Sequence, residues 1–427
     1  MFTQKSGVGD DPRATAGSTV SPGPRTPKAL LPSIALTAAA LFATYLAVSS
    51  ILLPTQVAQV DEENKVTNLA IVISASFVAA LITQPIVGAL SDRTRSRLGR
   101  RAPWMLIGAA VAMIFLLGMG GLRNLLWITV FWVVVQVALN ALQSPLSAVV
   151  PDRFPRSRRG IASAMMGIGT MIGTAFGTVI ASQFVNDIGL GYAAFGIGIL
   201  VVTVLFVAFN RDTSSVEVDI EPFQWKRFLA GFWVSPKKSP DFAWAFAARF
   251  FLIMGYFVVA TFNLYILTDY LGMPLQEAAA SAGLLALAGL IPTMIAIMLS
   301  GWWSDRIGRR KVFIYAASVF MVAGLSMPLL FPSLTGMIAM SVLNGFGFGL
   351  YMACDAALMT EVLPADGVAA GKDLGILNLA TSIPQAASPA VAGIIIGSFG
   401  GYSPLFVFGM IAVVVAALLI VPIKGVR

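Results

Sequence analysis

One stretch of the chain reads Gly88-Ala-Leu-Ser-Asp92-Arg93-Thr-Arg-Ser-Arg-Leu-Gly99-Arg100-Arg101, and a second reads Gly301-Trp-Trp-Ser-Asp305-Arg306-Ile-Gly308-Arg309-Arg310-Lys311. Each stretch separates two long apolar runs. The first aspartates of the two stretches are 213 positions apart, and two other acids that close apolar runs, Asp152 and Glu361, are 209 positions apart. Because an offset near 210 recurs in a chain of 427 residues, the sequence predicts a duplicated set of helices.

The composition places these helices in a membrane. Hydrophobic residues make up 57% of the chain and charged residues 11%, whereas soluble domains carry about 25% charged residues. A spanning helix needs about 20 apolar residues, so we expect an all-α polytopic membrane protein with twelve spans in two pseudo-symmetric six-helix bundles. The expected spans are Leu30–Leu53, Val66–Leu90, Pro103–Leu122, Leu125–Val149, Ile161–Ser182, Gly191–Phe209, Phe242–Leu267, Ala278–Trp302, Val312–Phe331, Thr335–Met359, Leu374–Ser398 and Leu405–Val421.

The placement of the basic residues predicts the orientation. All 28 Lys and Arg residues except Lys65, Arg123 and Arg249 fall in the two tails or in loops on one side of the expected bundle. By the positive-inside rule, both termini are expected to be cytoplasmic in a multi-pass protein of the plasma (inner) membrane. The net charge of +8 therefore indicates orientation in a lipid bilayer and not a nucleic-acid partner.

The chain divides into four expected segments. Residues 1–28 are rich in Pro, Gly, Ser and Thr, lack the apolar core of a signal peptide, and are expected to form a disordered cytoplasmic tail. Residues 29–209 and 242–427 are the two bundles. Residues 210–241 are a cytoplasmic linker, in which aromatic residues between Phe223 and Trp233 predict a short interfacial helix.

Missing residue types exclude several classes of protein. The sequence has no histidine and one cysteine, Cys354, which excludes His-based triads, His metal sites and a disulfide framework. No phosphate-binding Gly-x-x-x-x-Gly-Lys-[Ser/Thr] loop is present, and the loops are too short for a nucleotide-binding domain. We therefore expect a protein that is not an enzyme, uses no cofactor and takes its energy from a gradient.

The two opening stretches bring acids and arginines together at the rim of the bundle. The glycines allow helix ends to approach closely, and clustered charges there can form a latch that breaks as the halves move. The alternative is that the arginines only anchor topology and bind lipid headgroups. The candidate gating residues are Asp92, Arg93, Arg100, Arg101, Asp152, Asp305, Arg306, Arg309, Arg310 and Glu361.

The motif Gly-x-x-x-Asp-Arg-x-Gly-Arg-Arg-Lys, repeated at matched positions, resembles the signature of the major facilitator superfamily, over roughly residues 30–425. The longer first copy, and Asn140-Ala-Leu-Gln143-Ser-Pro145, resemble the sucrose-transporter-like and glycoside–pentoside–hexuronide cation symporter branch. This resemblance implies a central cavity lined by the first and fourth helix of each bundle, a small sugar-like solute, and H⁺ as the coupling ion.

The fourth span departs from that branch. Sucrose carriers place a membrane-embedded aspartate seven residues before the glutamine that corresponds to Gln143, and this chain has Gln136 there. An amide cannot carry a proton as a carboxylate does. The acidic cation-site residues of sodium-coupled members are also missing, so coupling through this part of the chain is in doubt.

Polar residues recur on one face of several spans, at helical spacings of four, seven and eleven. Amides, tyrosines and hydroxyls suit hydrogen bonding to a neutral polyhydroxylated solute. The alternative is that buried amides only hold helices together, at about 0.6–2 kcal/mol each. The candidate solute-binding residues are Tyr45, Ser49, Gln56, Gln136, Asn140, Gln143, Tyr256, Asn263, Asn344, Tyr351, Asn378 and Gln385.

Two charges lie inside expected spans. Each costs about 3 kcal/mol on insertion scales, which favours pairing. At 1.5 Å per residue, Arg249 lies roughly 10 Å and Asp355 roughly 6 Å from the same membrane face. We expect an ion pair, with Asp355 as the candidate protonatable coupling group; a static structural bridge is the alternative.

Glycine and proline also carry predictions. Gly169, Gly173 and Gly177 form a ridge that predicts close helix packing. Pro384 and Pro389 are expected to break the eleventh span.

Three functions remain open at this point. The first is alternating-access symport of a sugar or glycoside with protons. The second is proton-driven export of a drug or small metabolite. The third is a membrane sensor that transports nothing.

Overall fold

The computed structural model describes residues 29–212, 215, 240–307, 310–361 and 370–423. All regular structure in these residues is helical, and 12 of the described helices are long and apolar enough to cross a membrane. The expected all-α architecture and number of spans are confirmed. The predicted tail at residues 1–28 and the interfacial helix lie outside the described residues.

The N-terminal half contains six spans. The first runs without interruption from Leu30 to Val60 through a π-helical turn. The elements of this half are α1 (Leu30–Ala47), η1 (Val48–Leu52), α2 (Leu53–Val60), α3 (Lys65–Asp92), α4 (Ala102–Met119), α5 (Leu125–Arg153), η2 (Arg156–Arg158), α6 (Arg159–Ser182) and α7 (Ile188–Phe209).

The C-terminal half repeats this plan. Its elements are α9 (Pro240–Ala260), α10 (Asn263–Tyr265), η3 (Ile266–Tyr270), α11 (Leu275–Ile307), α12 (Arg310–Leu330), α13 (Leu334–Glu361), α14 (Ala370–Phe399) and α15 (Ser403–Ile420). A π-helical turn lies in the first span of the N-terminal half, and a second lies just after the first span of the C-terminal half.

The seventh span differs from the prediction of one helix over Phe242–Leu267. The helix α9 ends at Ala260, and the backbone of Phe262 leaves the helical region. The Thr261 hydroxyl donates to the Phe257 carbonyl (2.9 Å), and the Phe262 N–H bonds three residues back (3.2 Å). These bonds satisfy the backbone while the chain turns into α10 and the π turn η3.

The eleventh span corrects a second prediction. Pro384 and Pro389 do not break it, because α14 runs continuously from Ala370 to Phe399. Pro389 has no N–H to donate to the Gln385 carbonyl. The Ser388 hydroxyl donates to that carbonyl instead (3.2 Å), so the helix continues without an unsatisfied group there.

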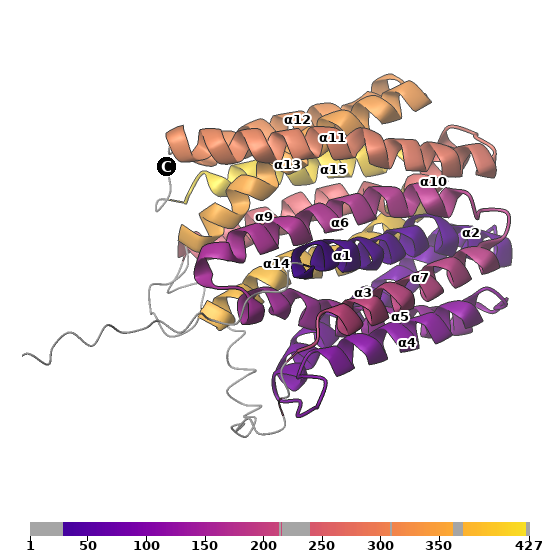
Figure 1. Cartoon of the computed structure of the whole chain (residues 1–427). Coiled ribbons are helices and arrows are strands. Elements are labelled where there is room, and N and C mark those ends of the chain that lie inside the picture. The colour runs from indigo at the N-terminus through magenta and orange to yellow at the C-terminus, as the bar shows by residue number, and fades with distance from the viewer. Residues whose placement is uncertain (1–28, 213–214, 216–239, 308–309, 362–369, 424–427) are drawn as a thin grey trace, which may run out of the picture.

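The two halves lie side by side as one bundle of nearly parallel helices (Figure 1). They meet where α3 packs against α14 and α6 packs against α11. We call the end where α1 begins and α3 and α5 finish the basic end. The opposite end, where α2 and α10 lie together in Figure 1, we call the far end.

The glycine ridge of α6 packs where the sequence predicts close contact. Gly169, Gly173 and Gly177 face Ala35, Ala39 and Ala43 of α1. A Cβ atom on any of these glycines would overlap the backbone of α1. The backbones of the first and fifth spans therefore touch at three points along about two helical turns, and α1 and α6 pack as one close pair.

This contact predicts the effect of adding a single methyl group. Gly173→Ala forces the two backbones apart, and overpacking of this kind costs about 1–3 kcal/mol. We expect a lower Tm of the detergent-purified protein, measured by intrinsic fluorescence. Gly167→Ala on the same helix is the matched control, because a Cβ at Gly167 meets nothing within 4 Å. Equal Tm values for the two variants would contradict the close packing.

Candidate functional site

A cavity of about 740 Å³ lies between the two halves. One wall comes from the first span and from α3, α5 and α6, and the other comes from α9, α10, α11, α13 and α14. Cavities that hold small molecules in proteins measure about 300–1,000 Å³. The size therefore fits a solute of one or a few rings.

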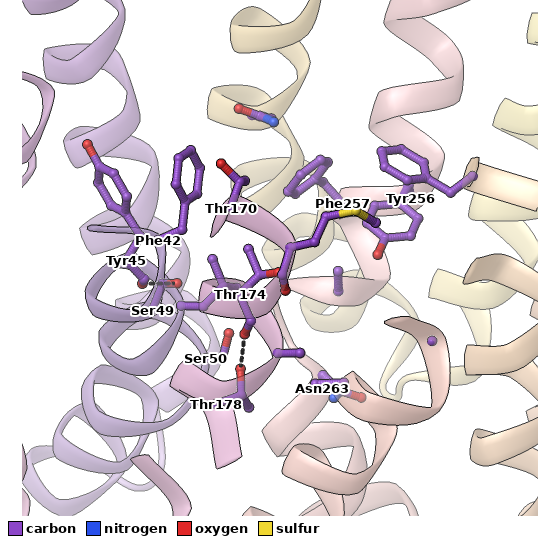
Figure 2. A pocket seen from close by; sticks show the side chains of 18 of the residues that line it. Phe42, Tyr45, Ser49, Ser50, Thr170, Thr174, Thr178, Tyr256, Phe257 and Asn263 are labelled. Carbon is purple, nitrogen blue, oxygen red and sulfur yellow. Dashed lines mark hydrogen bonds between the residues drawn. The ribbon is translucent and has the colours of Figure 1, made fainter. Parts of the chain in front are cut away.

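Figure 2 shows how neighbouring helices present polar and aromatic side chains to this space. Tyr45, Ser49 and Ser50 follow one another along the first span. The Ser49 hydroxyl donates to the Tyr45 carbonyl (2.7 Å), and the Thr178 hydroxyl of α6 donates to the Thr174 carbonyl (3.2 Å). These hydroxyls keep their acceptor capacity while their protons are held by the helix.

Most of the predicted solute-binding residues line the cavity. They come from the first, fourth, seventh, tenth and eleventh spans, although they are far apart in the sequence. The lining residues that the sequence predicted are Tyr45, Ser49, Gln136, Asn140, Gln143, Tyr256, Asn263, Asn344 and Gln385.

Gln56 does not belong to this group. Its side chain is buried, its amide donates to the Met119 carbonyl (2.7 Å) and the Leu122 carbonyl (3.1 Å), and its oxygen accepts from Tyr192 (2.8 Å). The prediction assumed regular helical spacing after Ser49. The π turn at Val48–Leu52 adds to the helix circumference and turns the residues after it onto another face.

Tyr351 and Asn378 are the other two predicted solute-binding residues that are not among the lining residues named above. Tyr351 is 1% exposed and is not part of the cavity wall; its hydroxyl donates to Oδ1 of Asp355 (2.8 Å). Its role in the structure is to hold the carboxylate and not to face a solute. The side chain of Asn378 lies outside the described residues.

The cavity also contains residues that the sequence analysis did not select. The threonines Thr170, Thr174 and Thr178 of α6 recur every fourth residue, which is the same one-faced signal as on the selected helices. The resemblance implies a cavity lined by the first and fourth helix of each bundle, and α6 is the fifth span, so these threonines lay outside that expectation. Other polar lining residues that were not selected are Ser50, Gln84, Thr293, Ser341 and Thr381.

The helices α9 and α13 are bridged by two pairs of side chains in antiparallel register. Arg249 pairs with Asp355, and seven residues further along α9 the ring of Tyr256 stacks on Phe348, with centroids 4.5 Å apart and 20° between the planes. Both aromatic rings belong to the cavity wall. Charge and aromatic contact thus join the same two helices at two depths.

The predicted intramembrane ion pair is confirmed. Nη1 of Arg249 lies 3.1 Å from Oδ2 of Asp355, and Asp355 is 4% exposed. Both carboxylate oxygens are occupied, one by Arg249 and the other by Tyr351. Arg249 is part of the cavity wall, and among the described lining residues it is the one charged side chain. A solute can therefore reach the pair through the arginine.

A second charge cluster lies at the basic end of the N-terminal half. Arg101 bonds Asp92 (2.5 Å), Asp152 (3.0 Å) and the Ser91 hydroxyl (2.8 Å), and Arg100 bonds Asp152 (3.1 Å). This cluster ties the loop between α3 and α4 to the end of α5. The expected meeting of acids and arginines therefore occurs in the first copy of the repeated motif.

The second copy of the motif is less fully described. Arg306 lies in the last turn of α11, and Arg310 begins α12. In the first copy, the corresponding arginine, Arg93, follows the last residue of α3. The side chains of Asp305, Arg309 and Glu361 lie outside the described residues, so a matching cluster in the C-terminal half stays a prediction.

Comparison with known sequences gives sugar transport and carrier proteins as well as an efflux protein. The chain is 27% identical to the fujikurins efflux protein of Gibberella fujikuroi over an alignment of 347 residues. The alignment covers 79% of this chain and 69% of that protein. It is 22% identical over 412 residues to the sucrose transport protein SUT5 of Oryza sativa subsp. indica, with 78% and 76% covered. A third relative is the raffinose carrier protein of Pediococcus pentosaceus, 23% identical over 290 residues, with 62% and 44% covered.

Solved structures share the fold at low sequence identity. A bacterial homologue of the human lysosomal transporter Spinster has a TM-score of 0.67 at 15% identity, covering 93% of this chain and 95% of that chain. A D-xylose–proton symporter has a TM-score of 0.66 at 15% identity, covering 92% and 98%.

The family follows from the sequence profile and agrees with the twelve-span architecture. The profile described as the Major Facilitator Superfamily matches residues 30–297 and 278–426, which together cover nearly the whole described chain. The related proteins named above are transporters and not enzymes. The chain belongs to the major facilitator superfamily of membrane transporters.

Proposed function

We propose that this protein is a secondary active transporter that works by alternating access and carries a sugar or glycoside together with protons. The observation that carries the proposal is the set of amides and hydroxyls around the cavity. Amide side chains both donate and accept hydrogen bonds, which matches the hydroxyl groups of a sugar. Gln136, Asn140 and Gln143 of α5 supply three such amides on one wall.

The charge of the cavity wall supports a neutral solute. No acidic side chain is among the described lining residues, and the charge of Arg249 is balanced by Asp355 behind it. A cationic solute would find no counter-charge there and would lose its hydration without compensation. A neutral polyhydroxylated solute exchanges its water for amides and hydroxyls, and the faces of Tyr256 and Phe348 can cover its apolar side.

Several polar atoms of lining residues have no hydrogen-bond partner among the described residues. They are the Tyr45 hydroxyl, Nε of Arg249, the Asn344 amide oxygen and the Thr381 hydroxyl. Buried polar groups in proteins are nearly always paired. These atoms support a site that is completed by a solute, by water or by another state of the transport cycle.

Asp355 is the proposed proton-coupling group. A proton on this carboxylate would remove the attraction that holds Arg249 and would leave the guanidinium able to turn toward a solute. Loss of the proton would restore the pair. Since the fourth span has Gln136 in place of a carboxylate, the C-terminal half is proposed to carry the coupling that its relatives place in the N-terminal half.

The orientation is part of the proposal. The basic end carries Arg100, Arg101 and most of the other loop arginines, so the positive-inside rule places it, with both termini, in the cytoplasm. We place the protein in the plasma (inner) membrane. In this orientation the ion-paired residues around Arg101 form part of the proposed cytoplasmic gate.

Proton-driven export of a drug or metabolite is the second candidate. Two observations favour it: the fujikurins efflux relative covers 79% of the chain, and aliphatic and aromatic side chains occupy much of the cavity wall. Solute counterflow in proteoliposomes distinguishes the two candidates. Sucrose and phenyl glycosides should exchange against themselves if the first is correct, and only hydrophobic metabolites or cations should do so if the second is correct.

Removing the charge of Asp355 should separate coupling from exchange. In the Asp355→Asn variant we expect counterflow of labelled solute to persist while accumulation driven by an imposed pH gradient is lost, because the amide binds no proton. Glu63→Gln, which removes an exposed acid between the first two spans, is the matched control and should leave accumulation unchanged. Normal pH-driven accumulation in the Asp355→Asn variant would show that Asp355 is not the coupling group and forms only a structural ion pair with Arg249.

Removing one amide should weaken solute binding. Gln143 lines the cavity and has no side-chain hydrogen bond to another described residue, so Gln143→Leu deletes a solute contact without leaving a protein group unpaired. A lost hydrogen bond of about 1–1.5 kcal/mol corresponds to a rise of roughly tenfold in the KM for sugar counterflow. Gln183→Leu, an exposed glutamine after α6, should not change KM. Equal KM values for Gln143→Leu and the unmodified protein would show that Gln143 does not bind the solute.

A further inference from the structure

Two polar contacts join the halves of the protein at the far end, just beyond the cavity. Nζ of Lys65, at the start of α3, lies 2.9 Å from Oδ1 of Asp269 in η3. The Tyr265 hydroxyl donates to the Pro54 carbonyl (2.8 Å), and Tyr265 is 2% exposed. Ser50 and Asn263, which line the cavity, lie four and two residues before Pro54 and Tyr265. These contacts therefore join the two halves within about one helical turn of residues that line the cavity.

Lys65 has a second partner within its own half. Its Nζ lies 2.6 Å from Oε1 of Glu62, and the Lys65 side chain is 13% exposed while that of Glu62 is 73% exposed. The ring of Tyr265 lies beneath the ammonium group, 5.3 Å from Nζ to the centroid. The lysine is thus held by one acid of each half, and the acid of its own half reaches toward solvent.

Asp269 is arranged in the same way on the other side. Its Oδ2 accepts from the Tyr402 hydroxyl (2.6 Å), and its Oδ1 accepts from the Thr268 hydroxyl (2.8 Å). Burial, and then the hydrogen bond with Asp269, raise the pKa of Tyr402, so its hydroxyl stays protonated as a donor. Both donors belong to the C-terminal half. Each member of the Lys65–Asp269 pair therefore has partners that remain with it if the halves separate.

We propose that Lys65 and Asp269 form a latch whose two charges are handed to partners in their own half when the far end opens. Lys65 then keeps Glu62, and Asp269 keeps Tyr402 and Thr268. This inference takes the alternating-access movement of the proposed function and adds the gate on the far side. Breaking a half-buried ion pair is costly when a charge is left alone. Partners that stay behind lower that cost and keep the gate reversible.

The backbone beside the latch supports a moving part. Pro54 follows the π turn η1 by two residues, and Asp269 lies within the π turn η3. π-helical turns are rare and occur mostly at functional sites. The turn η1 lies within the first span of the N-terminal half, and η3 lies just after the first span of the C-terminal half, directly after Tyr265.

The proposal predicts opposite effects from removing two acids that touch the same lysine. Asp269→Asn removes the cross-half partner and destabilises the closed far end, so the open population should rise. Glu62→Gln removes the partner that Lys65 keeps after opening, so the open population should fall. We expect a fivefold to tenfold change of the open-to-closed ratio in each direction, equivalent to about 1–1.4 kcal/mol. Lys65→Met should act like Asp269→Asn.

The populations can be measured as distances between spin labels in the detergent-purified full-length chain, with no solute. The labels are placed at Leu126→Cys and Gln276→Cys, exposed far-end positions of the two halves, in a Cys354→Ser background. Tyr265→Phe, which removes the bond to Pro54, supplies a background with a larger open population in which a decrease can be seen. Glu63→Gln and Glu277→Gln are matched exposed-acid controls that should not shift the distances.

The direction in which each variant changes the distance between the two labels tests the proposal. Longer distances with Asp269→Asn and shorter ones with Glu62→Gln support the hand-over. A shift of both variants in the same direction, or no shift with Asp269→Asn, overturns it. Lys65→Arg should behave like the unmodified chain, and gel filtration of every variant shows that it is folded. Because no transport is measured, failure of the latch is distinguishable from failure of the proposed sugar symport.

Discussion

The bilayer core offers no hydrogen bonds to the backbone, and this constraint governs the rest of the structure. Every described span is therefore a helix, and two irregularities are satisfied locally: the Ser388 hydroxyl bonds the carbonyl that Pro389 leaves open, and the Thr261 hydroxyl bonds a carbonyl at the end of α9. The larger departures, the π turns η1 and η3, lie beside the cavity or at the far end. Irregular backbone is thus confined to places where protein or water can meet it.

The same constraint explains how charges are placed along the bundle axis. Arg101 meets two acids at the basic end, Arg249 meets Asp355 within the C-terminal half, and Lys65 meets two acids at the far end. The first cluster lies within one half, the second faces the cavity, and the third joins the halves. Isolated charges are expensive at membrane depth, and each of these three basic side chains has an acidic partner in the structure.

The cavity wall combines a hydrogen-bonding surface with an aromatic one. Amides of α5 and threonines of α6 face aromatic rings from α9 and α13, so a hydroxyl-rich group and an apolar ring can both be accommodated. The efflux and sugar-transport proteins to which the chain is similar are 22–27% identical to it, so the shared family does not by itself fix the solute.

Hydrophobicity, spacing and the cost of buried charge act locally, so the sequence by itself determined the twelve spans, the duplication, the glycine ridge on α6 and the pairing of Arg249 with Asp355. Helical spacing also placed about half of the polar lining residues. Tertiary structure alone decided the rest. A single π turn moved Gln56 from the cavity to the ends of α4 and α7, and the packing of α3 and α6 brought Gln84 and Thr174 to the wall. The partner of Lys65 lies 204 residues away in the other half, and no local pattern specifies a contact that exists only when two bundles meet.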